Sequence, residues 1–504
     1  MNSIIDIAEK KSSENYKLKE SRNQKWDKVE HAVILAAGNG SRFKEKGVEL
    51  PKVLLKVGGL RLLERAILAL NQVGVKHFYI VVGAYKEQII GVMSKIKRLE
   101  DLDVNFVECA DYELGNGVSF GKGAEKIDAP FLLTMSDHIF SIKTLQAFID
   151  NVKEVPELPA LACDPNLEEV FDMDDATKVQ SKNGFIHKIN KQLTSYDLID
   201  TGLFYFPANY GKKIAQKAKE GAHGVSDIMK QLIVENGVRT AVIKKAIWQD
   251  VDNPSMRKEA EKRLLQTLVK DTDGWVSKNI NRVFSTRTSL FLSKFNTSPN
   301  FVTTFVFFFT LWGAWMVSTG EYMYIALGGL IFQIASILDG CDGELARLTY
   351  KGSRFGAWYD TITDNIRYVV FLTALGIGAY NATGNELYFY CAIVLAIFAS
   401  YTAFIMGKFV WQNGGPLTNL EVTKQVDENV NNSEGLFSKI VKNLRGIEKQ
   451  DVSAFMAFIL CIIGLYKVMF WIAFVGVIIA AFAVTKSINA AKKRALNVNV
   501  EAKT

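Results

Sequence analysis

Six apolar segments in the second half of the chain limit most strongly how it can fold. They lie near 300–318, 322–345, 357–379, 386–411, 452–466 and 468–486. Each is close to the ~20 residues with which an α-helix crosses a bilayer. Because an unpaired backbone group is costly in lipid, such segments are expected to be helical. The second half is therefore predicted to be an all-α domain of six transmembrane helices, with the lipid bilayer as a partner.

The basic residues around these segments predict the orientation of the domain. Six crossings return the chain to the side from which it started. The inner side would then carry Lys351, Arg354, the basic residues of 424–449 and the basic run 492–494. The outer loops at 319–321 and 381–385 contain no Lys or Arg, as the positive-inside rule requires. This arrangement predicts a multi-pass protein of a plasma membrane or inner membrane with both termini in the cytoplasm.

The first half has the mixed charged and apolar composition of a soluble protein. Residues 1–29 are polar and lack the apolar core of a secretory signal, so the soluble half is expected to stay in the cytoplasm. The net charge of +7 is scattered, and no nucleic-acid partner is predicted. The five Cys residues show neither paired nor metal-type spacing, which is typical of a reduced environment.

Alternating strand and helix patterns predict an α/β doubly wound, Rossmann-like domain in this half. The stretch 31–43 reads as an apolar strand that runs into a loop, 77–83 and 131–137 read as further strands, and 61–72 and 141–153 read as helices. A glycine-rich loop follows the first strand. Its Gly38 and Gly40 would let backbone N–H groups surround phosphates. The loop is neither a Walker A motif nor a full GxGxxG, so by itself it fits an ordinary turn equally well.

Three aspartates stand at predicted strand ends of the soluble half. Asp137 ends one strand, and Asp250 and Asp252 lie near the end of the domain. In open α/β sheets, ligands bind in the crevice beyond the carboxyl ends of the strands. An aspartate in this position can also simply cap the following helix.

Four further aspartates lie within two of the apolar segments. Helical spacing puts Asp339 and Asp342 on one face of the first segment, and Asp360 and Asp364 on one face of the next. Ionised groups at membrane depth are costly and usually meet partners or a wet cavity. Oxygen-only ligands favour hard cations, so the pattern predicts a site for Mg²⁺ or Mn²⁺.

The full pattern DxxDGxxARx8Gx3Dx3D resembles the CDP-alcohol phosphotransferase family, and the likeness covers roughly 274–490, including Asn281, Arg282 and 298–300. The resemblance implies that Asp364 is the general base and also a metal ligand with Asp339, Asp342 and Asp360. It implies that the CDP group is bound by Asp339, Gly343, Ala346, Arg347 and Gly356. Arg354 and Arg367 are acceptor candidates, although either fits an inner-surface or packing role.

The soluble half resembles nucleotidyltransferases that join an NTP to a sugar or polyol phosphate. The resemblance covers roughly 30–265 and depends on LAAGNGSRF, the Pro51–Lys52 pair, LGNG at 114–117, SDH at 136–138, DTGLF at 200–204 and DVDNP at 250–254. It implies that the nucleotide, CTP, is held by Ala36, Ala37, Gly38, Gly40, Arg42, Lys52, Asn116 and Gly117. It further implies that Lys52 is a catalytic cation and that Asp137 and Asp252 are Mg²⁺ ligands. Asp250 would support one of these ligands from behind or replace it as a ligand. The acceptor would be bound by Lys188, Lys191, Asp200 and Gly202.

The order of the two halves is similar to the family of bifunctional inositol-1-phosphate cytidylyltransferases and di-inositol phosphate synthases. The resemblance implies a first step from CTP and inositol-1-phosphate to CDP-inositol and pyrophosphate. It implies a second step from CDP-inositol and another inositol-1-phosphate to phosphorylated di-myo-inositol phosphate and CMP. The two steps would belong to the biosynthesis of an osmolyte. The resemblance also implies a homodimer formed through the membrane domain. The expected domains are an extension at 1–29, a cytoplasmic nucleotidyltransferase at 30–268, a juxtamembrane amphipathic helix or plain linker at 269–297, and the membrane domain at 298–504.

Two other functions fit the same residues. The second domain could take a lipid alcohol as acceptor, because membrane helices suit lipid chemistry. A membrane-anchored nucleotide sensor or scaffold with a degenerate nucleotide fold is an alternative of another class, although the complete aspartate set disfavours it.

Overall fold

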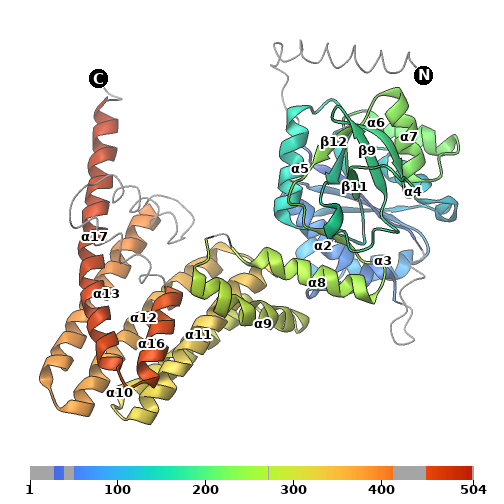
Figure 1. The fold of residues 1–504 in the computed structure, drawn as a ribbon. Coiled ribbons are helices and arrows are strands. Elements are labelled where there is room, and N and C mark those ends of the chain that lie inside the picture. Colours follow the sequence, from blue (N-terminus) through green and yellow to red (C-terminus); the bar gives the residue numbers. More distant parts are fainter. Residues whose placement is uncertain (1–27, 39–49, 271, 413–449, 502–504) are drawn as a thin grey trace. The chain divides into compact units, whose positions relative to one another are not determined.

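The computed structural model describes residues 28–38, 50–270, 272–412 and 450–501, and the side chains of 406–412, 483 and 486–501 are left out of the description. The chain forms two compact units, the first ending at Thr267 and the second beginning at Leu268. Figure 1 shows the strands and helices of the first unit and the helices of the second. Each unit has its own cluster of buried apolar residues. The predicted extension at 1–29 lies almost wholly outside the described residues.

The first unit alternates strands and helices. Its strands are β1 (His31–Ala36), β2 (Lys56–Val57), β3 (Leu60–Arg61), β4 (His77–Val82), β5 (Asp103–Glu108), β6 (Phe131–Met135), β7 (His138–Phe140), β8 (Ala160–Asp164), β9 (Lys178–Lys182), β10 (Phe185–Asn190), β11 (Leu198–Phe206), β12 (Arg239–Val242) and β13 (Trp248–Asp250). Its α-helices are α2 (Leu62–Gln72), α3 (Lys86–Met93), α4 (Asn116–Ala124), α5 (Ile142–Glu154), α6 (Tyr210–Lys219), α7 (Val225–Glu235) and α8 (Pro254–Leu268), which runs to the first residue of the second unit. Short 3₁₀ turns are η2 (Lys52–Leu54), η3 (Lys97–Leu99), η4 (Tyr112–Leu114) and η5 (Leu167–Glu169).

The main sheet of the first unit has the strand order β5-β4-β1-β6-β11-β8-β12-β10-β9 within the described residues. β5, β4, β1 and β6 are parallel, with His31 opposite both His77 and Phe131. The chain leaves β1 towards β4 and later returns to β6 on its other side, which creates a crevice at the carboxyl ends of these strands. The doubly wound fold is confirmed. The sheet is mixed, because β11 runs antiparallel to β6 and β8.

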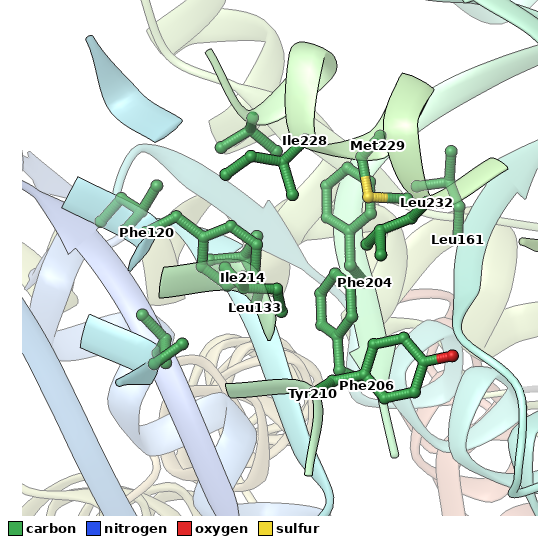
Figure 2. Packing of buried hydrophobic residues seen from close by; sticks show 14 of the residues in the cluster. Phe120, Leu133, Leu161, Phe204, Phe206, Tyr210, Ile214, Ile228, Met229 and Leu232 are labelled. Atoms are coloured by element: carbon green, nitrogen blue, oxygen red, sulfur yellow. The ribbon is translucent and has the colours of Figure 1, made fainter. Parts of the chain in front are cut away.

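The core of the first unit explains why β1 is apolar after His31. Ala32, Val33 and Ile34 are completely buried, as expected for a central parallel strand covered on both faces. On one face, α4, α6 and α7 contribute a large apolar cluster. Figure 2 shows its aromatic centre, where Phe204 and Phe206 of β11 lie among side chains of α4, α6 and α7. This packing fixes β6 and β11, whose ends carry site residues.

The second unit is helical throughout its described part. Its elements are the π-helical turn η6 (Ser277–Asn281) and the helices α9 (Arg282–Lys294), α10 (Pro299–Ser318), α11 (Tyr322–Leu348), α12 (Arg354–Thr383), α13 (Glu386–Gln412), α16 (Gln450–Ile462) and α17 (Tyr466–Glu501). Six of these helices coincide with the six predicted apolar segments, so the all-α fold is confirmed. Three described stretches, in α10, α11 and α13, are long and apolar enough to cross a membrane. Two shorter apolar stretches lie in α16 and α17.

Small residues let the membrane helices approach closely. A Cβ atom added to Gly378 of α12 would lie 2.2 Å from the carbonyl oxygen of Val317 in α10, and one added to Gly328 would lie 2.5 Å from that of Gly313. Such contacts are typical of helix packing in lipid, where apolar burial gives little driving force. They hold α10, α11 and α12 in one bundle, and the acidic residues of α11 and α12 meet within it.

A helix, α9, occupies much of the segment expected to be juxtamembrane. Its Ser285 and Ser289 are fully buried, whereas Phe284 and Phe291 are 57% and 58% exposed. The polar side chains thus face the bundle and the aromatic side chains face outward. This is the reverse of a helix on a water-soluble protein, and it fits an apolar or interfacial environment.

Two candidate active sites

The first unit contains a cavity of ≈ 470 Å³ at the carboxyl ends of its central strands. Its wall includes the ends of β1, β6, β11 and β13. Among its lining residues are the predicted site residues Ala36, Ala37, Gly38, Lys52, Asn116, Asp137, Lys191, Asp200, Gly202, Asp250 and Asp252. Gly40 and Arg42 lie outside the described residues.

Lys52 is held between two carboxylates of this cavity. Its ammonium group donates to Asp137 at 2.6 Å and also pairs with Asp252, although the three residues come from distant parts of the chain. Burial alone would lower the pKa of Lys52, but the two carboxylates outweigh it and raise that pKa. Lys52 therefore stays charged, and Asp137 and Asp252 both point to one position.

His138 packs against the irregular part of β11 that carries two acceptor candidates, Asp200 and Gly202. Its Nδ1 lies 2.8 Å from an oxygen of Asp137. Burial raises the pKa of Asp137, but the hydrogen bonds and charges of His138 and Lys52 outweigh burial and leave that pKa well below its usual value. Gly202 has φ of +76°, and a Cβ there would lie 2.7 Å from the His138 ring. Its N–H donates to Asp200 at 2.7 Å. Burial raises the pKa of Asp200 to about 6.

The remaining predicted residues of the first unit have different surroundings. Asn116 begins α4 and accepts a hydrogen bond from the N–H of Val225 at 2.9 Å. Gly117 is buried against 222–224, where a Cβ would lie 2.6 Å from a carbonyl oxygen. Lys191 pairs with Asp175 at 2.6 Å. Lys188 is exposed on β10 and does not line the cavity.

Several lining residues were not found from the sequence. Val170, Phe171 and Asp172 line the cavity from an irregular segment that carries no motif. Arg263 of α8 reaches this segment, because it donates to the carbonyl oxygen of Glu169 and, at 2.9 Å, to that of Trp248. Only the fold brings these parts together, so the local sequence gives no signal for them.

The second unit gathers three of the predicted aspartates at one point. Asp339 and Asp342 of α11 and Asp360 of α12 each offer a carboxylate oxygen, and these atoms lie within 4.8 Å of one another. The Oδ1 atom of Asp360 is buried and has no hydrogen-bond partner among the described residues. A buried acceptor without a partner is costly, so the donor set fits a bound cation. Thr303 of α10, not found from the sequence, donates to Asp342 at 2.5 Å.

The fourth aspartate, Asp364, lies beside a buried arginine. The Nη2 atom of Arg367 lies 2.6 Å from Asp339 and 2.8 Å from Asp364, and its Nε donates to Asp364 at 2.9 Å. Only 6% of the Arg367 side chain is exposed. This arrangement favours a role in holding the aspartates over the predicted contact with an acceptor. Arg354 is exposed at the start of α12.

The other predicted residues surround the aspartate cluster. Gly343 lies beside Arg347, since a Cβ there would be 3.3 Å from the guanidinium. Gly356 follows Ser353, whose hydroxyl accepts its N–H at 2.9 Å and caps α12. Ala346 is partly buried, whereas Arg347 is exposed and donates to the carbonyl oxygen of Leu268 at 3.1 Å.

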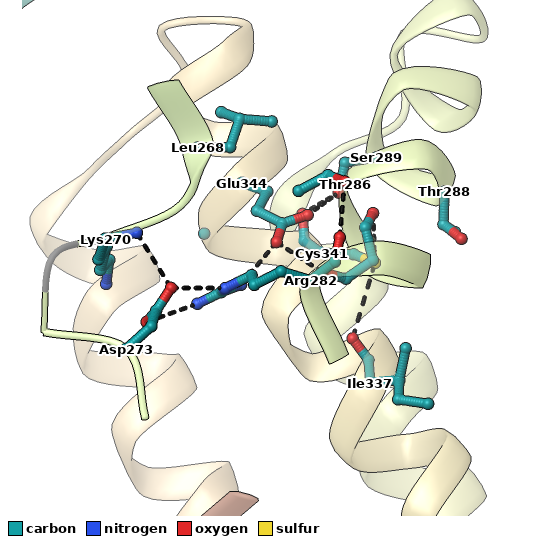
Figure 3. A network of polar contacts seen from close by, with 12 residues as sticks. Leu268, Lys270, Asp273, Arg282, Thr286, Thr288, Ser289, Ile337, Cys341 and Glu344 are labelled. Atoms are coloured by element: carbon teal, nitrogen blue, oxygen red, sulfur yellow. Dashed lines mark hydrogen bonds and ion pairs between the residues drawn. The ribbon is translucent and has the colours of Figure 1, made fainter. Parts of the chain in front are cut away.

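A buried acid of α11 lies on another face from the aspartates. Glu344 is completely buried and accepts hydrogen bonds from Arg282 at 2.6 Å, Ser285 at 2.6 Å and Ser289 at 2.7 Å. Figure 3 shows this network, in which Arg282 also reaches Asp273. A glutamate within an apolar helix is itself a signal, but its partners lie about sixty residues earlier and only the fold reveals them.

Comparison with known proteins matches a different family to each unit. Residues 32–235 match the MobA-like NTP transferase domain, and residues 296–481 match the CDP-alcohol phosphatidyltransferase family. A bifunctional IPC transferase and DIPP synthase of Aquifex aeolicus is 33% identical over 74% of this chain and 83% of its own length. The chain belongs to this family. The bifunctional IPC transferase and DIPP synthase of Thermococcus kodakarensis is 35% identical over 74% of this chain and 80% of its own length. That of Archaeoglobus fulgidus is 30% identical over 91% of this chain and 83% of its own length.

Membership of the bifunctional IPC transferase and DIPP synthase family makes the chain a bifunctional transferase with a nucleotidyltransferase domain and a CDP-alcohol phosphotransferase domain. Among solved structures, the inositol-1-phosphate CTP transferase from T. maritima is 22% identical, with a TM-score of 0.41 over 47% of this chain and 96% of that chain.

Proposed function

We propose that the two units catalyse two consecutive CTP-driven steps. The first joins CTP to inositol-1-phosphate and releases pyrophosphate, giving CDP-inositol. The second transfers inositol phosphate from CDP-inositol to another inositol-1-phosphate, giving phosphorylated di-myo-inositol phosphate and CMP. The observation that carries this proposal is the presence of two carboxylate centres in one chain: Asp137 and Asp252 around Lys52, and the cluster of Asp339, Asp342 and Asp360. The names of the relatives support the order of the steps.

In the first step, an oxygen of the acceptor phosphate attacks the α-phosphorus of CTP and pyrophosphate leaves. Lys52 lies in the cavity as a fixed positive charge and would stabilise the charge that develops on the α-phosphate. The loop of Ala36, Ala37, Gly38, Gly40 and Arg42 would hold the CTP phosphates, and Asn116 and Gly117 would lie against the base. Of the residues proposed to bind the acceptor, Asp200, Gly202 and Lys191 line the cavity. Lys188 stays a prediction from the resemblance.

In the second step, an acceptor hydroxyl attacks the phosphorus next to the inositol of CDP-inositol, and CMP leaves. Asp364 would take the proton from this hydroxyl. Arg367 holds Asp364 from one side, which fixes the direction of its carboxylate. Gly343, Ala346, Arg347 and Gly356, together with Asp339, would bind the CDP part.

Both sites fit a divalent metal by the chemistry of their donors. At the first site Asp137 and Asp252 converge on one cationic group. At the second, Asp339, Asp342 and Asp360 bring carboxylate oxygens together, with Asp364 proposed as a fourth ligand, and one buried oxygen of Asp360 has no hydrogen-bond partner in the described part of the chain. Mg²⁺ or Mn²⁺ would neutralise phosphate charge there.

The membrane domain is proposed to span the bilayer with six helices. The apolar lengths of α10, α11 and α13 support crossing, and the inner-side basic residues support cytoplasmic termini and a cytoplasmic first unit. The homodimer and the domain boundaries expected from the sequence stay predictions.

A product analysis tests the proposed function. Membranes containing the full chain are incubated with CTP, Mg²⁺ and labelled inositol-1-phosphate, and pyrophosphate, CMP and labelled products are measured. We expect pyrophosphate release that depends on inositol-1-phosphate, and a labelled product that stays in water. Pyrophosphate release independent of inositol-1-phosphate would contradict the first step. Label entering the organic phase would identify a lipid acceptor, and no turnover at all would favour a sensor or scaffold.

A further inference from the structure

Three cationic residues gather where the second unit begins. Arg347 of α11 donates to the carbonyl oxygen of Leu268 at 3.1 Å, which places its guanidinium against the segment that carries Lys270. Arg282 of α9 lies on the other side of Asp273 from that segment (Figure 3). Positive charges repel one another, so neighbouring anions would stabilise this group of cations.

Among the described residues, Arg282 makes both ion pairs that Asp273 and Glu344 form with these three cations. Asp273 accepts two N–H groups of Arg282, at 2.8 and 3.2 Å, and otherwise accepts the backbone N–H of Lys270 at 3.0 Å. Glu344 accepts from the remaining side of Arg282. Within the described part of the chain, no carboxylate pairs with the ammonium of Lys270 or the guanidinium of Arg347. Both side chains are solvent-exposed.

These two exposed cations lie beside the aspartate cluster. The guanidinium of Arg347 lies against Gly343, the residue after Asp342, because a Cβ added to Gly343 would be 3.3 Å from its Nη1. The same guanidinium donates to the carbonyl oxygen of Leu268, two residues before Lys270. The pKa of Lys270 is lowered, mainly by partial burial and to a smaller extent by the charges of Arg347 and Arg282. An anion bound between Lys270 and Arg347 would relieve this repulsion and would lie next to the proposed metal ligands.

We infer that Lys270 is a phosphate-binding residue of the second site, where it works with Arg347 on an oxyanion of a substrate. The inference rests on the proposed function. Two phosphates reach this site: the diphosphate of the CDP-alcohol donor and the phosphate monoester of a soluble acceptor. A lipid alcohol without a phosphate would have no group for this residue to bind.

The test is a kinetic comparison of Lys270→Gln with the unchanged full chain in membranes, supplied directly with CDP-inositol and inositol-1-phosphate. A charge-assisted hydrogen bond to phosphate is worth enough that we expect KM for one substrate to rise about tenfold. kcat should change far less, and Lys270→Arg should recover most of the loss. A higher KM for inositol-1-phosphate identifies the acceptor phosphate as the ligand, and a higher KM for CDP-inositol identifies the donor diphosphate.

Lys294→Gln is the matched control, because it removes the same charge from an exposed position of the same unit at the far end of α9. It should leave both KM values unchanged. Unchanged KM values in Lys270→Gln, or a fall in kcat alone, would overturn the inference while the proposed function stands. If the unchanged protein forms no CMP from supplied CDP-inositol, the proposed second step fails and the inference fails with it.

Discussion

Glu344 Oε1 lies 2.6 Å from Nη1 of Arg282, and this ion pair ties α11 to α9. Asp342, only two residues earlier, faces Thr303 of α10 and the aspartate cluster. A helix turns about 200° over two residues, so α11 presents one acid to each side. The rotation of α11 about its axis, and with it the direction of Asp339 and Asp342, is therefore set by Glu344.

Glu344→Gln should damage the second site without changing any of its aspartates. Among the described residues, the change leaves Asp273 as the carboxylate partner of the Arg282 guanidinium, so the loss should be below the roughly 3–5 kcal/mol of a fully broken buried pair. We expect a lower unfolding temperature of the full chain in detergent and a reduced rate of CMP release. Pyrophosphate release by the first unit should persist.

Glu386→Gln is the control for this change, since Glu386 is exposed at the start of α13. It should alter neither quantity. Full CMP release and unchanged stability in Glu344→Gln would show that the hydroxyls of Ser285 and Ser289 suffice to hold α11.

Lys52→Met should abolish most of the first step. Removal of one preorganised positive group at a reacting phosphate typically costs about 10²- to 10³-fold in rate. We expect this loss in pyrophosphate release, measured with CTP and inositol-1-phosphate, while CMP release from supplied CDP-inositol continues. Lys56→Met, at an exposed position four residues later, should behave like the unchanged chain. Normal pyrophosphate release by Lys52→Met would remove Lys52 from the chemistry.

The strongest sequence signals were those that need no tertiary information. Six apolar segments predicted six helices, because hydrocarbon tolerates little else, and Asp339 and Asp360 stood out because charge is rare there. The direction of β11 could not be predicted, since side-chain periodicity is the same in parallel and antiparallel strands. Phe171, Arg263 and Thr303 were missed because their place at a site depends on contacts with residues far away in sequence.

Asp200→Asn should stabilise the first unit at neutral pH. Burial raises the pKa of Asp200 from 3.8 to about 6, so its ionised form is less favourable in the folded state than in the unfolded state. The contribution of this carboxyl to the free energy of unfolding is complete below the pKa of the unfolded state. It is lost as the pH rises through the pKa of the folded state. We expect the Asn variant to be more stable near pH 7 by about 1–2 kcal/mol, allowing for partial solvent exposure.

The advantage of Asp200→Asn should disappear at about pH 3 and below, under the unfolded pKa, where the carboxyl is largely protonated in both states. Thermal unfolding of the full chain at both pH values measures this difference. The N–H of Gly202 can still donate to the Asn oxygen, so the local backbone of β11 should be kept. Asp101→Asn, at an exposed position, should show no such pH dependence. Equal stability of Asp200→Asn and the unchanged chain near pH 7 would contradict the raised pKa.

Asp364→Asn should stop the chain between its two steps. The change keeps the size of the side chain and a possible hydrogen bond to Arg367, but it removes the group proposed to accept the proton of the attacking hydroxyl. Loss of a general base costs about 10²- to 10⁴-fold. We expect pyrophosphate release from CTP and inositol-1-phosphate to continue, CMP release to fall by this factor, and labelled CDP-inositol to accumulate.

The pH dependence of Asp364→Asn separates the loss of a base from the loss of a metal ligand. A variant that lacks only a ligand should recover when Mn²⁺ or Mg²⁺ is raised, and it should keep the acidic limb of the CMP-release profile. A variant that lacks the base should lose that limb and should not recover with added metal. Asp360→Asn is the matched comparison, because Asp360 belongs to the oxygen cluster and lies one turn earlier on α12. It should recover in part with metal, and identical behaviour of the two variants would remove the proposed distinction between Asp364 and the other aspartates.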